Sequence, residues 1–584
     1  MKIIFAYPPG RFPTVVYDPG ETWDALSGMK GITCGYFNGN VEWWRLFCST
    51  AFVEFLSGRL PLQEIISGKL PGKFTPATLA RIALLAGDAL SRMQDKRNFA
   101  SVERYAETLE PLSSYVRLTN FLQPEFRVTF NNGPEVNGLD YLTSSEMVEY
   151  AGRDTLLSKS IDETSVLVQK KPDLCFLSVT SPYDLLTSLI LAKCLRRRYP
   201  DIYLSILSHS YENFSLDNHG DNLVKTGGVL EVVDSIVKFN FQKDKVAVDI
   251  VKELQAGRRP KGFIERSGSL SVCEPAAKDL PLVEAFSPEP IFWMRLSDKK
   301  CYWGRCVFCA QNAKHKAGGI PSEVDIDRSL SRIEKLIKRG YGYFYFCDEA
   351  VPPRLLEYLS DIIIKKKMVF KWACRCRIEP EYTEYFFRKL KAAGCYEVLF
   401  GLESVTPRVQ QLMRKYDHTV DECCAKSIID SASRAGLGIH LTFIVGFPGE
   451  RLEETKATLV FLAKGLKNVR RSTYYINNFT LYAQSAVYEN PGAYGIIPGV
   501  VHGDIGTACG YSFCAESMGA EDKRIWAALP ELVGCVETEL GWAKFHKKHE
   551  TILLRDLYFN YGHGAYLKSM EHDIFIPKPA DRKP

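Results

Sequence analysis

Cys301-Tyr-Trp-Gly-Arg-Cys306-Val-Phe-Cys309 concentrates three thiols within nine residues, in the spacing C-x4-C-x2-C. Thiolates gathered this closely bind zinc, copper(I) or iron–sulfur clusters. Gly304 allows the loop to turn back tightly, so that the three sulfurs can converge on one small object. No fourth cysteine lies nearby, and three protein ligands would therefore leave one metal position open for chemistry.

Two simpler interpretations compete with a reactive cluster. A structural zinc site needs a fourth ligand, and the nearest candidate, His315, lies in the polar sequence Ala-Lys-His-Lys, which is typical of an exposed turn. Alternatively, the three cysteines could be small buried hydrophobic residues. A zinc-stabilised binding protein therefore stays open as the non-enzyme alternative, although neither interpretation explains the segments that follow the cysteines.

Length and charge limit the class of protein. A chain of 584 residues is long enough for about two to four domains, and a formal net charge of +5 implies neither nucleic acid nor an acidic membrane surface as a partner. The apolar start, Lys2–Tyr7, is too short for a signal peptide, and Leu185–Leu195 is too short to span a bilayer. We therefore expect a cytoplasmic protein whose 17 cysteines are metal ligands and buried thiols.

The first part of the chain, residues 1–257, predicts an α/β domain with a parallel, doubly wound sheet. Lys2–Tyr7 is a buried strand that ends at Pro8-Pro9-Gly10, and from Pro172 strands and helices alternate. Strands are expected at Leu174–Val179, Ile202–Leu207 and Val232–Lys238, and helices at Tyr183–Arg198 and Lys243–Ala256. Residues of about 20–150 have helical patterning and are predicted to form a helical insertion.

Two groups of residues in this part could contact a ligand. Ser178, Thr180 and Ser181 lie at the carboxyl end of an expected strand, which is the edge where open α/β sheets bind ligands. Their hydroxyl groups could hold a phosphate or an amide-rich cofactor, or they could simply cap the next helix. Trp43 and Trp44 could line a ligand face, although such aromatic pairs more often belong to a core.

The second part, residues 291–491, predicts an open (β/α)6 barrel that follows a linker at residues 258–290. Strands are expected at Ile291–Leu296, Tyr341–Phe346, Val369–Cys374, Glu397–Phe400, Gly438–Val445 and Thr473–Leu481. Helices are expected at Ile326–Lys338, Pro353–Lys365, Glu381–Ala393, Val420–Ala435 and Leu452–Leu466. Residues 492–584 are expected to form a mixed or helical extension, in which Cys509, Cys514 and Cys535 could hold a second cluster, although their spacing is sparse.

Three further motifs follow the cysteines, each at the end of an expected strand. They are Tyr343-Phe-Tyr-Phe-Cys-Asp348-Glu349, Ala392-Ala-Gly-Cys-Tyr-Glu-Val-Leu-Phe-Gly401-Leu-Glu403-Ser404 and Ile444-Val-Gly446-Phe-Pro448-Gly449-Glu450. In this order behind a cysteine triad they resemble the radical SAM superfamily, over about residues 290–491. One feature departs from the family, because its commonest spacing is C-x3-C-x2-C and here one extra residue separates the first two cysteines.

The resemblance implies a [4Fe–4S] cluster held by Cys301, Cys306 and Cys309, with one iron free to chelate S-adenosylmethionine (SAM). It also implies SAM contacts from Phe308 near adenine, Asp348 or Glu349 at the amino group, Glu403 at the ribose or amino-acid part, and Gly446 at the adenine side. The three carboxylates could instead be capping residues of nearby helices. The sequence identifies no catalytic residue.

A second resemblance lies in residues 1–257. The segments Tyr7-Pro8-Pro9, Lys171-Pro-Asp-Leu-Cys-Phe-Leu-Ser-Val-Thr180, Val233-Asp-Ser-Ile-Val237 and Leu254-Gln-Ala-Gly257 are similar to the Rossmann-like cobalamin-binding domain upstream of many radical SAM enzymes. This implies cobalamin contacts from Pro8, Ser178, Thr180 and Ser181. Ser208-His-Ser210 replaces the usual glycine pair, and no Asp-x-His-x-x-Gly motif supplies a lower axial histidine.

Together the two resemblances imply a class B radical SAM methyltransferase that uses a [4Fe–4S] cluster, SAM and cobalamin. Its substrate is expected to be a peptide or small molecule of the natural-product kind, and its reductant a flavodoxin or ferredoxin. Radical rearrangement, cyclisation or oxidation with the same cofactors stays open as the alternative. Neither nucleic acid nor a membrane is expected as a partner, and the sequence does not reveal the substrate or the oligomeric state.

Overall fold

A computed structural model of the protein describes residues 1–13, 15–17, 20–69, 74–99, 102–130, 132–141, 143–166, 171–208, 228–237, 243–264, 284–287, 290–297, 301–309, 320–469, 472–482, 485–496 and 520–540. The chain divides into two compact units, and the main division falls between Pro290 and Ile291. Among the described helices, none combines the length and the apolar composition that crossing a bilayer requires.

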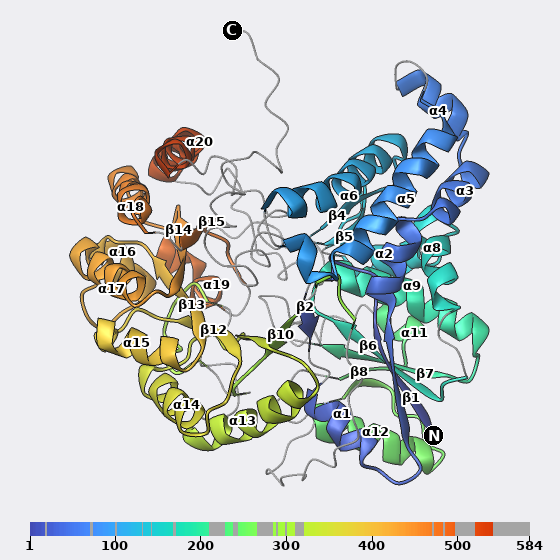
Figure 1. Ribbon diagram of the computed structural model, residues 1–584, viewed down its shortest axis with the longest axis horizontal. Helices are drawn as coiled ribbons and strands as arrows, with labels where there is room; N and C mark the ends of the chain where they lie inside the picture. The colour runs from blue at the N-terminus through green and yellow to red at the C-terminus, as the bar shows by residue number, and fades with distance from the viewer. Residues whose placement is uncertain are drawn as a thin grey trace. The chain divides into compact units, whose positions relative to one another are not determined.

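The first unit is built on a parallel sheet with the strand order β3-β1-β6-β7-β8-β9. The strands are β1 (Lys2–Tyr7), β3 (Thr33–Asn38), β6 (Leu174–Val179), β7 (Tyr203–Ser208), β8 (Ser235–Val237) and β9 (Gly262–Ile264). One face packs on α1 (Gly20–Ser27) and α12 (Lys243–Gln255), and the other packs on α9 (Pro182–Arg198) (Figure 1). The predicted doubly wound sheet is therefore confirmed, with β1 and β6 buried on both faces.

Three predictions for this unit need correction. The linker was expected at residues 258–290, but Gly262–Ile264 pairs with β8 as an edge strand of the main sheet. The helical insertion was expected from about residue 20, but Thr33–Asn38 pairs with β1 as an edge strand of the main sheet. That strand, with the sequence Thr-Cys-Gly-Tyr-Phe-Asn, is largely half-exposed and has no apolar run, so its pattern did not reveal it. A single strand was expected at Val232–Lys238, but the chain forms α11 (Gly228–Val232) and then only the short β8; Lys238 lies outside the described residues.

The insertion that follows β3 is mainly helical. It comprises α2 (Gly39–Phe47), α3 (Thr50–Arg59), α4 (Leu62–Lys69), α5 (Pro76–Arg92), η1 (Lys96–Phe99), α6 (Val102–Leu122), the hairpin β4 (Phe126–Thr129) and β5 (Gly133–Val136), α7 (Ser144–Ala151) and α8 (Leu156–Ser165). Trp43 and Trp44 of α2 are fully buried, and Trp44 stacks on Phe130 with ring centroids 5.6 Å apart. Both tryptophans therefore belong to a core and do not line a ligand face.

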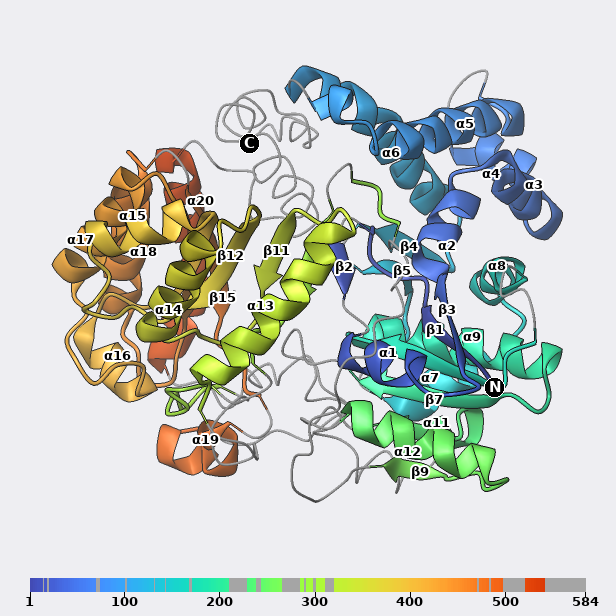
Figure 2. The same ribbon diagram turned by 60° about the horizontal axis from the view of Figure 1, so that its bottom comes forward.

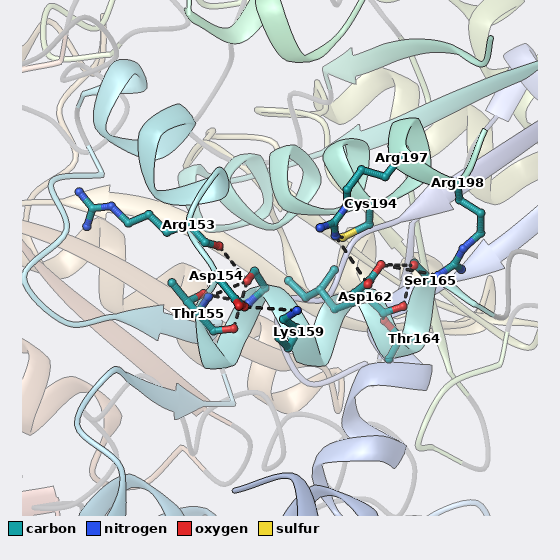
Figure 3. A network of polar contacts seen from close by, with 12 residues as sticks. Arg153, Asp154, Thr155, Lys159, Asp162, Thr164, Ser165, Cys194, Arg197 and Arg198 are labelled. Atoms are coloured by element: carbon teal, nitrogen blue, oxygen red, sulfur yellow. Dashed lines mark hydrogen bonds and ion pairs between the residues drawn. The ribbon is translucent and has the colours of Figure 1, made fainter. Parts of the chain in front are cut away.

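Polar contacts attach α8 to the end of α9 (Figure 3). Asp162 of α8 lies 3.6 Å from both Arg197 and Arg198 of α9, and the Ser165 hydroxyl donates to the Asp162 side chain at 3.3 Å. Because these charges are partly exposed, each pair contributes at most about 1 kcal/mol. They hold α8 in place beside a helix that is itself almost entirely buried.

The second unit contains parallel strands side by side in the order β15-β14-β13-β12-β11-β10. They are β10 (Ile291–Met294), β11 (Tyr343–Phe346), β12 (Lys371–Cys376), β13 (Cys395–Glu403), β14 (Gly438–Val445) and β15 (Ser472–Asn478). The helices α13 (Glu323–Lys338), α14 (Pro353–Lys365), α15 (Glu384–Ala392), α16 (Pro407–Met413), α17 (Glu422–Arg434) and α18 (Leu452–Leu466) follow one another along one side of the sheet (Figures 1 and 2). The predicted strand–helix alternation of an open barrel is confirmed.

Two short elements and one helix of 21 residues complete the described part of this unit. They are α19 (Ala486–Glu489), η4 (Pro491–Tyr494) and α20 (Ala520–Leu540). Cys535 lies on α20 and is exposed, whereas Cys509 and Cys514 lie outside the described residues. The remaining short strand of the chain, β2 (Val15–Tyr17), precedes α1.

The two faces of the barrel sheet differ in polarity. Phe346 and Phe400 are buried on the side of the helices. Strand register places Arg375, Leu399 and His440 in one row on the opposite face. Arg375 donates to the Tyr345 hydroxyl at 2.9 Å, and His440 Nδ1 lies 2.7 Å from the hydroxyl of Thr473. Polar side chains therefore line the face of the sheet that the helices leave uncovered.

Gly133 and Gly138 provide a matched test of how tightly the insertion packs on the loop after β1. Both have φ +74°, so alanine is strained at each by about 1–2 kcal/mol. A Cβ at Gly133 would lie 2.0 Å from the Gly10 carbonyl oxygen, whereas one at Gly138 meets nothing within 4 Å. We expect Gly133→Ala to lower the free energy of unfolding by about 1–3 kcal/mol more than Gly138→Ala, in urea unfolding followed by circular dichroism. Equal losses in the two variants would contradict this packing.

Candidate active site

The three predicted cluster cysteines lie on the loop that follows β10. Gly304 has φ +58°, the left-handed conformation that glycine adopts without strain, and the Cys309 N–H donates to the Cys306 carbonyl at 3.3 Å. All three thiols are half-buried. Burial of its sulfur raises the pKa of Cys306 to about 11, the nearby Lys415 ammonium lowers it, and Cys301 raises it further. The loop therefore brings the sulfurs of Cys301 and Cys306 within electrostatic reach of each other.

Backbone hydrogen bonds fix the second half of this loop. The Val307 N–H donates to the Met413 carbonyl at 3.0 Å, and the Val307 carbonyl accepts from the Val487 N–H at 3.1 Å. Val307 is fully buried, and Phe308 packs against the same apolar cluster, which includes Phe447 after β14. Phe308, the predicted neighbour of adenine, is thus positioned by the core at the carboxyl end of the sheet.

The donor chemistry of this loop fits an iron–sulfur cluster. Among the described residues, no three His, Cys, Asp or Glu side chains come together as ligands of one metal ion. A four-iron cluster does not require three ligands on one metal ion, because each thiolate binds its own iron. It requires three thiols that reach three different irons of one cluster. Three thiols on one short, half-buried loop meet that demand, and the nearby Lys415 ammonium partly offsets the cost of ionising the buried Cys306 thiol.

Asp348 and Glu349, the predicted partners of the SAM amino group, both have partners within the protein. Asp348 accepts from the N–H groups of Leu296 and Ser297 at 2.8 and 3.0 Å, and so ties the end of β11 to the chain just before the cysteine loop. Burial raises the pKa of Asp348 to about 6. Glu349 forms a two-pronged ion pair with Arg295, at 3.0 and 2.6 Å. Neither carboxylate caps α14, whose N-cap is Pro352.

Glu403 ends β13 in a strained conformation. Its φ of +67° is rare for a residue with a Cβ, and such strain persists only where the surroundings hold it. The buried Lys415 ammonium lies 3.0 Å from Glu403 Oε1. Burial opposes the charge on Lys415 and is the largest single effect, but Glu403 together with Cys306 and Tyr416 more than offsets it, so the pKa of that ammonium is raised. Gly401 is required beside them, since a Cβ there would lie 2.6 Å from Glu403 Oε1 and 2.8 Å from Lys415 Nζ.

Gly446 and Glu450 form a compact turn after β14. Gly446 has φ +73°, and its N–H donates to Glu450 Oε2 at 2.7 Å, while the Phe447 N–H donates to the same oxygen at 3.1 Å. Burial raises the pKa of Glu450 to about 7, against the lowering effect of these two N–H groups. Gly446, where the adenine of SAM is predicted to approach the backbone, therefore lies beside the buried carboxyl group of Glu450.

Arg377, Glu379 and Lys415 lie outside the motifs that the sequence analysis identified. Arg377 follows β12 and donates to both oxygens of Glu379, at 2.7 and 2.9 Å, and both side chains are buried. Lys415 follows α16, and no motif marks it, because its partner Glu403 is twelve residues away in the sequence. The local signal for the Arg377–Glu379 pair was the spacing Arg-x-Glu directly after a strand.

In the first unit, the predicted cobalamin contacts cluster at the carboxyl end of β6. The Thr180 N–H donates to the Asp184 carboxylate at 3.1 Å and the Thr180 hydroxyl donates to the same oxygen, while Ser181 is the N-cap of α9 and accepts from the Asp184 N–H at 3.1 Å. Ser178 is buried, and its hydroxyl has no hydrogen-bond partner among the described residues. Pro8 is buried after β1. The helix-capping interpretation therefore accounts for Thr180 and Ser181, but not for Ser178.

Comparison with known proteins agrees with the barrel geometry. Residues 300–462 match the Radical SAM superfamily, and this part of the chain is a radical SAM domain. The superfamily uses a [4Fe–4S] cluster and SAM. The uncharacterized methyltransferase PH0819 of Pyrococcus horikoshii is 24% identical over 254 residues, which cover 42% of this chain and 53% of that relative. The chain thus matches about half the length of this relative.

Two solved structures are similar in fold. The radical SAM methyltransferase TsrM of Kitasatospora setae, solved with cobalamin and a [4Fe–4S] cluster, has a TM-score of 0.49 and 12% identity, over 74% of this chain and 96% of that chain. The cobalamin-dependent SAM radical enzyme OxsB, solved with aqua-cobalamin, has a TM-score of 0.44 and 13% identity, over 75% of this chain and 78% of that chain.

Glu450→Gln tests the raised pKa at the turn after β14. The folded-state pKa of about 7 exceeds the usual 4.5, so the native state keeps a proton that the unfolded state releases. The free energy of unfolding therefore falls as pH rises from about 4.5 to 7. We expect Glu450→Gln to remove that fall, which amounts to at most about 3 kcal/mol, in urea unfolding at pH 5 and pH 7.5.

Glu453→Gln is the matched control, because Glu453 is an exposed carboxylate one turn further along the same segment, on α18. This substitution should leave the dependence of stability on pH as it is in the unmodified protein. A Glu450→Gln variant with the same pH dependence as the Glu453→Gln variant would contradict the raised pKa.

Proposed function

We propose that the protein is a cobalamin-dependent radical SAM methyltransferase. The observation that carries this proposal is the three-thiol loop at the carboxyl edge of an open parallel barrel, within residues 300–462 that match the Radical SAM superfamily. The first unit adds a doubly wound sheet of the kind that binds ligands at its carboxyl edge. The half-matched relative, PH0819, is named an uncharacterized methyltransferase, which supports the same assignment.

In the barrel, Cys301, Cys306 and Cys309 would hold the [4Fe–4S] cluster. When bound, the cluster supplies the electron that cleaves SAM to a 5′-deoxyadenosyl radical. The chain's own contribution is positioning and charge. Lys415 and Glu403 offer a buried ammonium and a buried carboxylate 3.0 Å apart, which complement the carboxylate and ammonium of the methionine part of SAM.

The other predicted SAM contacts take more specific roles in this proposal. Phe308 presents its ring next to the cysteine loop, and Gly446 leaves room for adenine against the backbone. Asp348 binds backbone N–H groups just before the cysteine loop and Glu349 binds Arg295 in the same segment, so we assign both carboxylates to the support of the loop. The methionine part is then recognised by Glu403 and Lys415.

Cobalamin binding is proposed for the first unit because of its strand order. In the order β3-β1-β6-β7-β8-β9, connections from the central strands β1 and β6 leave in opposite directions, which makes a topological switch point between them. Pro8 follows β1, while Ser178 and Thr180 end β6, so the predicted contacts meet at this point. The Ser178 hydroxyl is a buried group with no protein partner among the described residues.

The substrate and the remaining partners are proposed by chemical class. The uncovered face of the barrel sheet carries Arg375, Tyr345 and His440, which suits a polar small molecule or a peptide. Cleavage of SAM consumes an electron, so a reductant of the flavodoxin or ferredoxin type is required. Cys301, Cys306 and Cys309 must stay reduced to hold a cluster, which suits a reducing compartment such as the cytoplasm.

Cys306→Ala tests the cluster. After anaerobic reconstitution, we expect the unmodified protein to hold about four irons per chain, to absorb in the charge-transfer region and to form 5′-deoxyadenosine from SAM on reduction. Cys306→Ala should lose the absorbance and at least 99% of the 5′-deoxyadenosine. The control Cys423→Ala removes an exposed thiol of α17 and should change neither. Stoichiometric zinc without sulfide in the unmodified protein would overturn the proposal in favour of a structural zinc site.

Methyl transfer is separated from other radical reactions by labelled SAM. With methyl-labelled SAM and reductant, a methyltransferase of this kind should place label in the cobalamin fraction even before its substrate is identified. If 5′-deoxyadenosine accumulates while label never leaves SAM, the reaction is a rearrangement, cyclisation or oxidation, and the methyltransferase assignment is wrong.

Ser181→Tyr and Ser181→Ala test the cobalamin edge as a matched pair. Both remove the N-cap hydroxyl of α9, at about 1 kcal/mol, but only tyrosine adds bulk at the carboxyl end of β6. We expect Ser181→Ala to retain cobalamin through gel filtration and Ser181→Tyr to retain at least tenfold less. Equal retention by the two variants would contradict a cobalamin site at this edge.

A further inference from the structure

We infer that Tyr302 and Trp303, which lie in the lengthened gap between the first two cysteines, latch the cysteine loop onto a buried Arg377–Glu379 pair. Arg377 and Glu379 are then positioning residues for the cluster, and they act through the loop rather than by touching the cluster. The inference rests on the proposed function for the identity of the cluster, but the latch is a property of the chain alone.

Trp303 is the first contact of the latch. The Arg377 guanidinium lies over its ring, 3.8 Å from the centroid, which is close for a cation–π contact. Arg305 of the same loop lies 4.9 Å from that ring. The Trp303 Nε1–H donates to the Arg414 carbonyl at 3.0 Å. The indole is therefore held both by its face and by its edge, so its position follows from contacts with residues outside the loop as well as within it.

Tyr302 is the second contact. Its hydroxyl donates to Glu379 Oε1, the same oxygen that accepts from Arg377 Nε at 2.7 Å. Arg377 also lies 5.9 Å from the Tyr302 ring. The two aromatic residues of the gap thus bind the two members of one ion pair.

The ion pair is itself anchored to a third segment. Arg377 Nη1 donates to the Lys415 carbonyl at 3.0 Å, and the neighbouring Arg414 adopts φ +50°, which is uncommon for a residue with a Cβ. The latch therefore joins the loop after β10, the end of β12 and the turn after α16. Lys415, whose ammonium lies near the Cys306 thiol, is in that turn. Movement of the latch would shift both the loop and this charge.

The chemistry of the latch requires arginine at position 377. A guanidinium can stack on an indole, donate to both oxygens of Glu379 and reach a carbonyl at once, because its donors lie in one plane. An ammonium keeps the positive charge but cannot make these contacts together. Both partners are almost fully buried, at 6% and 8% exposure of the side chains, so a lost contact is not replaced by water.

The extra residue of the C-x4-C spacing gives the loop the length that the latch needs. Two consecutive large side chains must reach the ion pair from a loop that also returns Cys306 toward Cys301, and Gly304 supplies the turn with its φ of +58°. The longer gap provides the chain length for both requirements. The latch thus accounts for the one feature in which the cysteine motif departs from the commonest family spacing.

The test uses the full-length protein and three latch variants: Trp303→Leu, Arg377→Lys and the mild Tyr302→Phe. Hydrogen exchange of the amides of residues 301–309 is measured in the cluster-free protein. We expect at least tenfold faster exchange in Trp303→Leu and Arg377→Lys and about threefold faster exchange in Tyr302→Phe, with β13 and β14 unchanged. Arg388→Lys and Tyr385→Phe, at exposed positions on α15, are matched controls and should exchange like the unmodified protein.

The reduction potential of the reconstituted cluster is the second readout. A loosened loop admits water, which stabilises the more negatively charged reduced form, so the latch variants should have a higher potential than the unmodified protein. Arg377→Lys should not keep the reduction potential of the unmodified protein, although lysine keeps the positive charge. Unchanged exchange in Trp303→Leu and Arg377→Lys, or a potential fully preserved by Arg377→Lys, would overturn the latch. Failure of any cluster to form in the unmodified protein would refute the proposed function and leave the exchange measurement as the decisive test.

Discussion

Buried carboxylates at the carboxyl edge of the barrel sheet are the constraint on which the candidate site depends. Asp348, Glu379, Glu403 and Glu450 follow neighbouring strands, and each is nearly inaccessible to water. A carboxylate removed from water is costly unless charged or N–H partners surround it, so each of these side chains dictates the position of its donors. Asp348 holds the chain before the cysteine loop, Glu379 holds the loop through Tyr302, Glu403 holds Lys415, and Glu450 holds the turn at Gly446. The shape of the site is therefore set by where these charges find compensation.

Much of the scaffold could be predicted because its signals are local. β14, α14 and α18 were predicted to the residue. Glycines bound β14 and a proline begins α14, whereas α18 was marked by its apolar periodicity alone. β1 and β6 were also predicted to the residue, as short apolar runs buried on both faces. The order of strand-end motifs behind the cysteines then identified the barrel. The cysteine ligands, the SAM contacts and the cobalamin contacts themselves stay predictions.

The elements and residues that the sequence did not predict have one thing in common: their partners are distant in the sequence. β3 is a half-exposed edge strand defined by its pairing with β1, and nothing in its own six residues requires a strand. Arg377 and Trp303 are separated by more than seventy residues, and Lys415 is recognisable only beside Glu403. Such pairs come together through the fold of the whole unit. A sequence pattern can show that a charge exists near a strand end, but it cannot show which opposite charge will meet it.

The two units use the polar groups at their strand ends differently. In the barrel unit, two carboxylates (Asp348 and Glu450) bind backbone N–H groups, and two (Glu379 and Glu403) bind charged or hydroxyl side chains. In the first unit, Thr180 and Ser181 are occupied with Asp184 at the start of α9, and a Cβ on Gly10 would lie 2.7 Å from the Asp184 carboxylate. Gly10 is also in close contact with Gly133 of the insertion. Small residues thus bring backbone close to the switch point while the neighbouring hydroxyls are already hydrogen-bonded. A large cofactor at this edge would therefore be recognised mainly by the shape and the backbone of the loops after β1 and β6. Ser178 is the exception, because its hydroxyl is not already hydrogen-bonded within the described residues. This is why side-chain motifs indicate a cofactor site only weakly at this edge.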